Sequence, residues 1–173
     1  MTGREAKPFT RLFPRLMVIP SSATAKTIAG VRIATSVFFL LFGEYKLAGS
    51  GFAHGGFQGY LQDFIANGAV SFYRPFLSGV VLPHAVFFGY SVGVIELIIG
   101  ISLLLGLWVR CASVLAILFL LNLILSTWWG PGHGAPVWRY FGAELDHLPL
   151  VLLFIIFFAA DAGRVWGLNG RRK

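Results

Sequence analysis

One apolar segment constrains the fold of this chain more than any other part of the sequence. The segment from Pro83 to Arg110 is long enough for a membrane-crossing helix, and it carries a single carboxylate, Glu96, near its middle. At about 1.5 Å of rise per residue, the stretch from His84 to Leu107 covers the roughly 30 Å hydrocarbon core of a bilayer. An acid at that depth costs about 2.5 to 3.5 kcal/mol, so we expect Glu96 to face other helices and not lipid.

Small residues around Glu96 predict which face of this helix is packed. Gly89, Gly93, Glu96 and Gly100 follow helical spacing along one stripe, whereas bulky residues such as Ile98 lie off it. Glycines on one stripe let a second helix approach closely. An earlier apolar stretch carries a stripe with the same spacing, and we expect the two stripes to pack together: Arg32, Ser36, Phe39, Gly43 and Lys46.

Composition places the chain among integral membrane proteins. Of the 173 residues, 57% are hydrophobic and 12% are charged, and the mean hydropathy is +0.77. The single cysteine, Cys111, excludes an intramolecular disulfide and a CxxC redox centre. The four histidines lack HxxxH or HxH spacing, and no haem motif, flavin fingerprint or phosphate loop is present. We therefore expect neither a metal nor a flavin in this chain.

The hydrophobic pattern predicts an all-α protein, a four-transmembrane-helix bundle with an interfacial helical loop between spans 1 and 2. The loop, residues 48–83, is rich in glycine and aromatic residues, and we expect one or two amphipathic helices there that act as a lid. The membrane domain is predicted at 27–166, with spans at about 28–47, 84–106, 111–129 and 147–162. A basic cytoplasmic or interfacial leader is expected at 1–26 and a basic cytoplasmic tail at 167–173.

The distribution of basic residues predicts the orientation. Eleven of the fourteen Lys and Arg residues lie in the N-terminal part up to Arg32, the turn between spans 2 and 3, and the C-terminal part. The other three are Lys46, Arg74 and Arg139. The positive-inside rule then predicts a multi-pass protein of the inner (cytoplasmic) membrane with both termini in the cytoplasm.

Cations and histidines on the opposite side form a candidate anion site. In this topology the outer face carries Lys46, Arg74, His84 and Arg139, and arginine is well suited to hold an oxyanion. The alternative is that these are ordinary solvated residues whose field is cancelled by nearby acids. At the inner boundary, Asp161 is expected to pair with Arg32 or Arg164, although Arg32 has the simpler alternative of extending to the lipid headgroups.

Two interpretations of Glu96 stay open. As a catalytic residue it would be a proton relay or a hydrogen-bond partner for a bound molecule. As a structural residue it would be a protonated or paired acid that fixes the helix register, with Asn122 or Tyr90 as its partner. By depth, the nearest polar side chains on spans 1 and 3 are expected to be Ser36, Asn122 and Ser126.

Four motifs give the chain a resemblance to a known family. They are Arg32 with Gly43 and Lys46, FYRPFLSGVVLPHA at 72–85, Glu96 within ELIIGISLLLGLWVR, and AGRVWGLN at 162–169. From Arg32 onward the chain resembles the DoxX-like membrane proteins, and among them most closely the DoxD-type small subunit of thiosulfate:quinone oxidoreductase. The last motif departs from the family pattern, since members end it with aspartate where Asn169 stands.

The resemblance implies a four-helix fold and a membrane subunit of a quinone-linked oxidoreductase. Thiosulfate would be oxidised and a quinone would accept the electrons, with a second protein subunit supplying the redox group that this chain lacks. The alternative is a non-catalytic DoxX-like membrane anchor or scaffold for an oxidant-defence or redox assembly. A small-solute transporter is not favoured, because broken helices and inverted repeats are not evident, and nothing in the pattern suggests a nucleic-acid partner.

Overall fold

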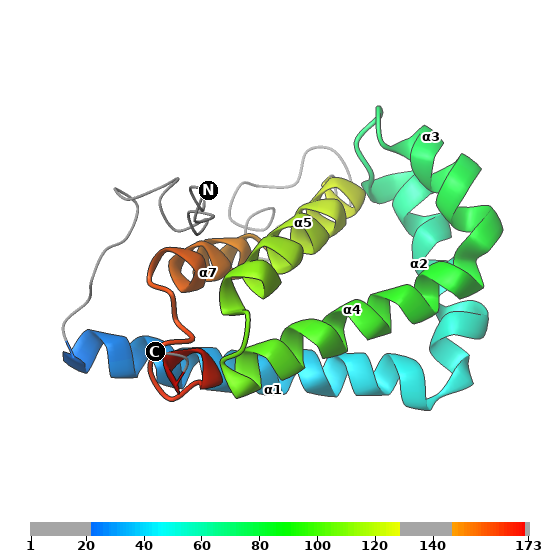
Figure 1. Cartoon of the computed structure of the whole chain (residues 1–173). Coiled ribbons are helices and arrows are strands. Elements are labelled where there is room, and N and C mark those ends of the chain that lie inside the picture. Colours follow the sequence, from blue (N-terminus) through cyan, green and yellow to red (C-terminus); the bar gives the residue numbers. More distant parts are fainter. Residues whose placement is uncertain (1–21, 129–146, 172–173) are drawn as a thin grey trace, which may run out of the picture.

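The computed structural model describes residues 22–128 and 147–171, and every regular element in these ranges is helical (Figure 1). Three helical segments are long and apolar enough to cross a membrane: α1 (Ser22–Ala48), the run Arg74–Leu105 that ends in α4 (Ala85–Leu105), and α5 (Val109–Thr127). The fourth predicted span appears as α7 (Leu148–Ala159), whose 12 residues rise about 18 Å. The all-helical membrane architecture is confirmed, whereas the described part of the fourth segment is shorter than a bilayer core.

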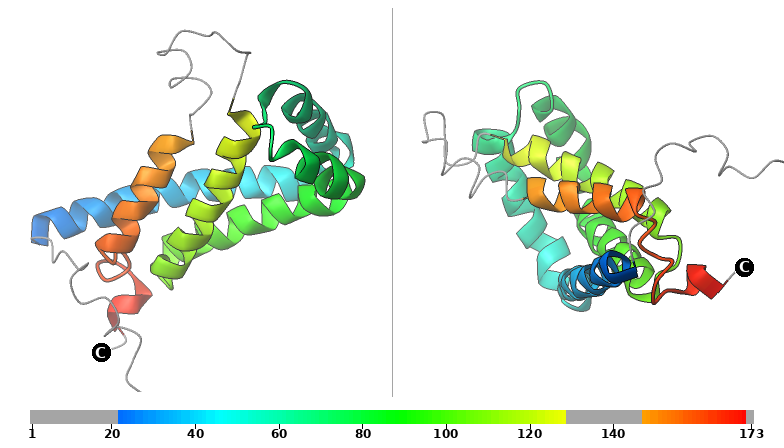
Figure 2. Two further views of the ribbon diagram at one scale, coloured as in Figure 1. Left: turned by 90° about the horizontal axis from the view of Figure 1, so that it is seen from above. Right: turned by 90° about the vertical axis from the view of Figure 1, so that its left-hand side faces the viewer.

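The helices α1 and α4 lie side by side along much of their length (Figures 1 and 2). Their contact follows the predicted stripes, because Arg32, Ser36, Phe39 and Gly43 are buried on α1 and the α4 glycines are buried opposite them. A Cβ added at Gly43 would lie 2.9 Å from the Gly93 carbonyl oxygen, and one at Gly100 would lie 2.9 Å from Leu40. The predicted packing of the two stripes is confirmed.

The helices α5 and α7 form a second pair that diverges from α1 and α4 beyond the α4–α5 turn (Figure 2). The pairs meet around aromatic rings: Phe39 of α1 packs edge-on against Phe154 of α7 at 5.4 Å between centroids, and Phe154 packs the same way on Phe157. All three rings are buried in the main apolar core.

Residues 52–84 form a series of short helices with a core of its own. The series comprises η2 (Phe52–Gly56), α2 (Phe57–Asp63), η3 (Phe64–Gly68), α3 (Arg74–Phe76), η4 (Leu77–Val81) and η5 (Leu82–His84). Its buried residues include Leu61, Leu77 and Val81. The series reaches the far end of α5, where the Val70 N–H donates to the Leu125 carbonyl at 3.1 Å (Figure 1).

The predicted second span at about 84–106 corresponds closely to α4, which begins at Ala85 and ends at Leu105. Helical backbone also precedes α4 from Arg74, but it passes through a wide turn at 77–81 and a tight turn at 82–84. Pro83 has no N–H to donate and its ring crowds the preceding turn, which explains the irregular backbone there. His84, with φ −116° and ψ 31°, ends the irregular part directly before α4.

The turn between α4 and α5 holds the C-terminal segment. Gly106 closes α4 with φ 62°, and Trp108 follows with φ 51°. An added Cβ at Gly106 would lie 2.5 Å from Arg32 Nη1, so only glycine fits this crossing of chains. The Asn169 N–H donates to the Gly106 carbonyl at 3.2 Å. The segment predicted as a basic cytoplasmic tail, 167–173, thus contacts the bundle through Asn169, which lies within η7 (Leu168–Arg171).

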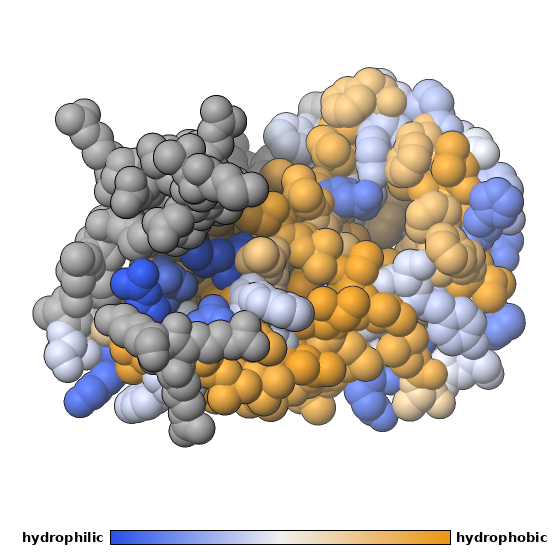
Figure 3. Space-filling model, viewed as in Figure 1, coloured by the Kyte–Doolittle hydropathy of each residue, from blue (hydrophilic) through white to orange (hydrophobic). Residues whose placement is uncertain are grey.

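The described surface carries a band of exposed apolar side chains. Apolar residues cover the middle of the face shown in Figure 3, and hydrophilic residues gather toward its two ends. The exposed apolar side chains on α1 and α4 include Phe38, Leu41, Phe87 and Ile98. Such a band is suited to contact with lipid.

Candidate functional site

The seam between α1 and α4 positions Glu96 in the interior. Gly93 lies one turn before Glu96, and a Cβ added there would lie 2.8 Å from Leu47 and 3.1 Å from the Lys46 Cβ. This close approach brings the end of α1 beside Glu96, whose exposed fraction is 6%. The expectation that Glu96 faces the bundle and contacts span 1 is confirmed.

Lys46 is the partner of Glu96. Its Nζ donates to Glu96 Oε1 at 2.5 Å, and the two side chains are 16% and 8% exposed. The Lys46 Nζ also lies 5.7 Å from the ring centroid of Phe42 and 5.5 Å from that of Phe52. Two aromatic faces and a carboxylate therefore stabilise the ammonium at this depth.

The partners that depth alone suggested for Glu96 make other hydrogen bonds. Asn122 Nδ2 donates to the Tyr73 hydroxyl at 2.6 Å and ties α5 to the segment before α3. Burial raises the pKa of Tyr73, and the bond from Asn122 opposes this in part. Ser36 donates to the Ile33 carbonyl and Ser126 to the Asn122 carbonyl. The prediction of these three partners is wrong. The hydroxyls of Ser36 and Ser126 donate to carbonyls of their own helices, and the amide of Asn122 donates to Tyr73.

A cavity of about 400 Å³ lies beside Glu96, between the α1–α4 pair and the α5–α7 pair. Its walls are almost entirely apolar, and the residues that line it are Thr35, Phe38, Phe39, Phe42, Glu96, Phe119, Leu120, Leu123, His147, Leu150 and Leu153. The second carboxylate oxygen of Glu96, Oε2, is buried and has no hydrogen-bond partner among the residues that the structure describes. A carboxylate oxygen of this kind is a strong acceptor for a bound molecule.

The cavity has an aromatic edge that faces outward. Phe38 and Phe42 line it from α1, and their exposed fractions are 60% and 57%. In a bilayer such exposure means contact with lipid chains, so a lipid-soluble molecule could enter between these rings without passing through water. The Thr35 hydroxyl is engaged, since it donates to the Val31 carbonyl at 2.8 Å.

The cavity includes residues that sequence reasoning did not assign to it. His147 and the phenylalanines of α1 and α5 are not among the predicted site residues. The sequence feature that could have predicted a cavity is the short fourth apolar segment. Because α7 has 12 residues and α1 has 27, α7 cannot cover the whole inner face of α1.

The four residues of the candidate anion site are not joined in the described structure. Lys46 is paired with Glu96, and Arg74 donates from Nε to the Ala69 carbonyl at 2.9 Å. His84 is exposed about three helical turns after Arg74. Within 22–128 and 147–171 no hydrogen bond or ion pair links any two of these residues, and Arg139 lies outside the described residues.

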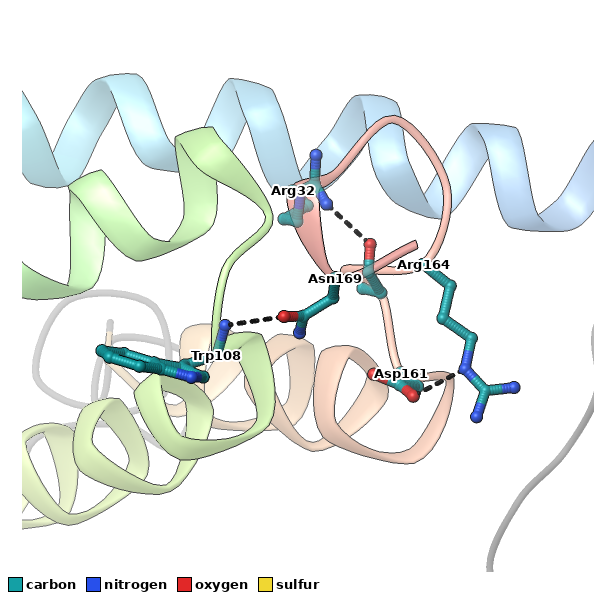
Figure 4. Close-up of polar contacts among 6 residues, drawn as sticks. Arg32, Trp108, Asp161, Arg164 and Asn169 are labelled. Atoms are coloured by element: carbon teal, nitrogen blue, oxygen red, sulfur yellow. Dashed lines mark hydrogen bonds and ion pairs between the residues drawn. The ribbon is translucent and has the colours of Figure 1, made fainter. Parts of the chain in front are cut away.

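Arg32 and Asp161 lie in the same region but have different partners (Figure 4). Arg32 is fully buried and donates to the carbonyls of Ala162, Val165 and Trp166 at 2.8, 3.4 and 3.0 Å. Asp161 pairs with Arg164 at 2.7 Å, the second of its two proposed partners. The Trp108 N–H donates to Asn169 Oδ1 at 3.4 Å. Among the described residues Arg32 pairs with no acid, and it is buried and not extended outward, because the folded-back segment supplies carbonyl acceptors.

Comparison with known proteins identifies the family. The sequence model of the DoxX family matches residues 27–129, which include most of α1, the 52–84 series, α4 and α5. No curated protein matches the chain, and no solved structure matches it. The match spans about three fifths of the sequence and contains Glu96, Lys46 and most of the cavity wall. This multi-pass membrane protein therefore belongs to the DoxX family.

Proposed function

We propose that this chain is a membrane subunit of a quinone-linked oxidoreductase, and that the cavity beside Glu96 receives the quinone. The observation that carries the proposal is an apolar, aromatic-lined cavity with one acidic side chain, Glu96, in its wall. A volume of about 400 Å³ is in the range of ligand pockets, which are mostly apolar with a few placed polar groups. The exposed rings of Phe38 and Phe42 suit a ligand that arrives from the lipid phase.

The residues of the cavity fit the chemistry of such a ligand. When bound, a quinone takes up two electrons and two protons to become a hydroquinone. Glu96 lines the cavity and would exchange a proton with the ligand. Lys46 contacts one of its carboxylate oxygens and lies at the end of α1, partly exposed, so it connects Glu96 with the membrane boundary. In this arrangement Glu96 is the catalytic residue and Lys46 is its positioning residue.

The electron donor is proposed to bind on the outer face. The resemblance to the DoxD-type subunit suggests thiosulfate, a divalent oxyanion that needs cationic and N–H donors. Arg74, His84 and Arg139 would bind it, while Lys46 is already engaged by Glu96. The chain has no paired cysteines, haem motif or flavin fingerprint, so electrons would pass through a second subunit.

The proposal includes four membrane crossings with both termini in the cytoplasm. The buried Arg32 bonds to carbonyls that follow α7, so the end of α7 lies beside the first half of α1 and beside the α4–α5 turn. Among the described residues, the same end of the bundle carries the basic residues Lys26, Arg32, Arg110 and Arg164. If α7 belongs to a fourth crossing, the number of crossings is even and both termini lie on the same side of the membrane.

The proposal is tested on the protein purified from its native membranes together with its partners. We expect extraction with organic solvent to release a quinone, and thiosulfate-dependent quinone reduction to fall at least about tenfold in Arg74→Gln. The matched control is Arg15→Gln, which removes a cation that lies before the membrane domain. Equal loss in both variants, or a preparation with partners but without quinone or activity, would favour the membrane-anchor function instead.

A further inference from the structure

We propose that the end of the bundle that holds the α4–α5 turn lies in the headgroup layer of the membrane, and that the rings of Trp108 and Trp166 anchor it there. Trp108 belongs to the turn itself, and Trp166 belongs to the segment that follows α7. Neither residue lines the cavity, so the inference is independent of the proposed quinone site. Its basis is the depth, the exposure and the backbone of the two tryptophans, together with the cations beside them.

Helix lengths place Trp108 at the boundary of the hydrocarbon core. The 21 residues of α4 and the 19 residues of α5 rise about 31 and 28 Å, close to the roughly 30 Å of that core, and Trp108 lies in the turn that joins them. The segment that contains Trp166 is held against the same turn. The Asn169 N–H donates to the Gly106 carbonyl at 3.2 Å, and Arg32 donates to the Trp166 carbonyl at 3.0 Å. Both tryptophans therefore lie at the level where acyl chains give way to headgroups.

The two rings are exposed although their backbones are held in place. The exposed fractions of Trp108 and Trp166 are 64% and 61%, and their φ values are 51° and 50°. This left-handed conformation is unfavourable for a residue with a Cβ. Neighbouring segments maintain it, because the Trp108 N–H donates to Asn169 Oδ1 (Figure 4) and the Trp166 carbonyl accepts from Arg32. Indole rings presented outward from a fixed backbone suit an environment that is apolar on one side and wet on the other.

Cations flank both tryptophans, as the headgroup layer favours. Arg110 follows Trp108 by two residues, and its guanidinium carbon lies 4.5 Å from the ring centroid of Phe158 on α7. Among the described residues Arg110 has no hydrogen-bond or ion-pair partner, so its N–H donors are available to a lipid phosphate. Arg164 precedes Trp166 by two residues, and its side chain is 54% exposed. A surface with exposed indole rings and arginines suits phospholipid headgroups better than it suits water or hydrocarbon.

Depth-dependent fluorescence quenching tests the proposal on the full chain in lipid bilayers. The bilayers contain phospholipids that carry bromine either just below the headgroup or near the ends of the acyl chains. Wild-type protein is compared with Trp108→Phe and with Trp166→Phe, so that the fluorescence lost on each substitution is the contribution of that ring. We expect each contribution to be quenched at least about twofold more by the shallow bromine than by the deep bromine.

Ile98→Trp is the matched control, because Ile98 is 51% exposed near the middle of α4 and its added fluorescence should be quenched more by the deep bromine. Equal quenching of Trp108 and Trp166 by both lipids, or stronger quenching by the deep bromine, would overturn the proposal. Absence of quenching by either lipid would overturn it as well. Access of a water-soluble quencher to the rings would then indicate a surface for a protein partner, and protection from that quencher would indicate contact between copies of this chain.

Discussion

At the scale of single residues, the half-buried Lys46 and the fully buried Arg32 are stabilised in different ways. Lys46 has a carboxylate and two aromatic rings, whereas Arg32 has three backbone carbonyls. The difference follows from side-chain chemistry, since a planar guanidinium can donate to several carbonyls at once and an ammonium suits one close charge. Arg32 is thus the residue that fastens the segment after α7 to α1.

Replacement of Arg32 should loosen the C-terminal segment. Arg32→Ala leaves the carbonyls of Ala162, Val165 and Trp166 without their donor, and we expect a loss of about 2 to 4 kcal/mol in stability, measured by denaturation in detergent. Arg32→Lys should recover less than half, since one ammonium cannot satisfy all three. The matched control is Arg164→Gln, whose half-exposed pair with Asp161 should change stability by less than about 1 kcal/mol. Equal losses at Arg32 and Arg164 would contradict the role given to Arg32.

At the scale of helices, the α1–α4 seam sets the depth and orientation of the site. Glycines on both helices bring the backbones close enough for Lys46 to reach Glu96. The 12 residues of α7 cover only part of α1, and the divergence of the two helix pairs leaves the cavity. The site is therefore a consequence of one tight helix pair beside one short helix.

A methyl group at the seam should be destabilising, and one elsewhere on the same helix should not. Gly43→Ala would place a Cβ 2.9 Å from the Gly93 carbonyl, a backbone atom that cannot rotate away, and we expect a loss of about 1 to 3 kcal/mol. Gly30→Ala is the control on α1, because no atom lies within 4 Å of its added Cβ. It should be neutral or stabilising by up to about 1 kcal/mol. Denaturation in detergent compares the two, and similar behaviour would refute the close packing.

At the scale of the whole molecule, the arrangement gives the bundle two unlike ends. One end holds Arg32, the α4–α5 turn and the folded-back C-terminal segment, and the other holds the 52–84 series (Figure 1). The cavity lies between these ends, with walls that include Thr35 to Phe42 of α1 and Glu96 of α4.

The native cysteine provides a test of orientation. Cys111 is exposed at the start of α5, beside the α4–α5 turn, and it is the one cysteine in the sequence. A membrane-impermeant thiol reagent should label it only after the membrane is opened, because the positive-inside rule predicts that this turn lies in the cytoplasm. In a Cys111→Ser background, Ser78→Cys on the 52–84 series should be labelled in intact cells. Labelling of Cys111 in intact cells would reverse the orientation.

The sequence by itself determined the features that depend on local periodicity and hydropathy. Apolar length predicted the helices α1, α4 and α5, and the spacing of Gly89, Gly93 and Gly100 predicted the face on which α1 packs. The same spacing placed Glu96 in the interior, because the cost of an acid in lipid and the helical repeat are both properties of a single segment.

Only the tertiary structure decided which polar groups meet. Lys46 pairs with Glu96, and Arg32 with the carbonyls after α7, across 50 and 130 or more residues of sequence. These pairs depend on how closely the helices approach and where each helix ends, and such quantities have no local signal. The cavity arises in the same way, since its walls come from four helices whose divergence and unequal lengths no single segment encodes.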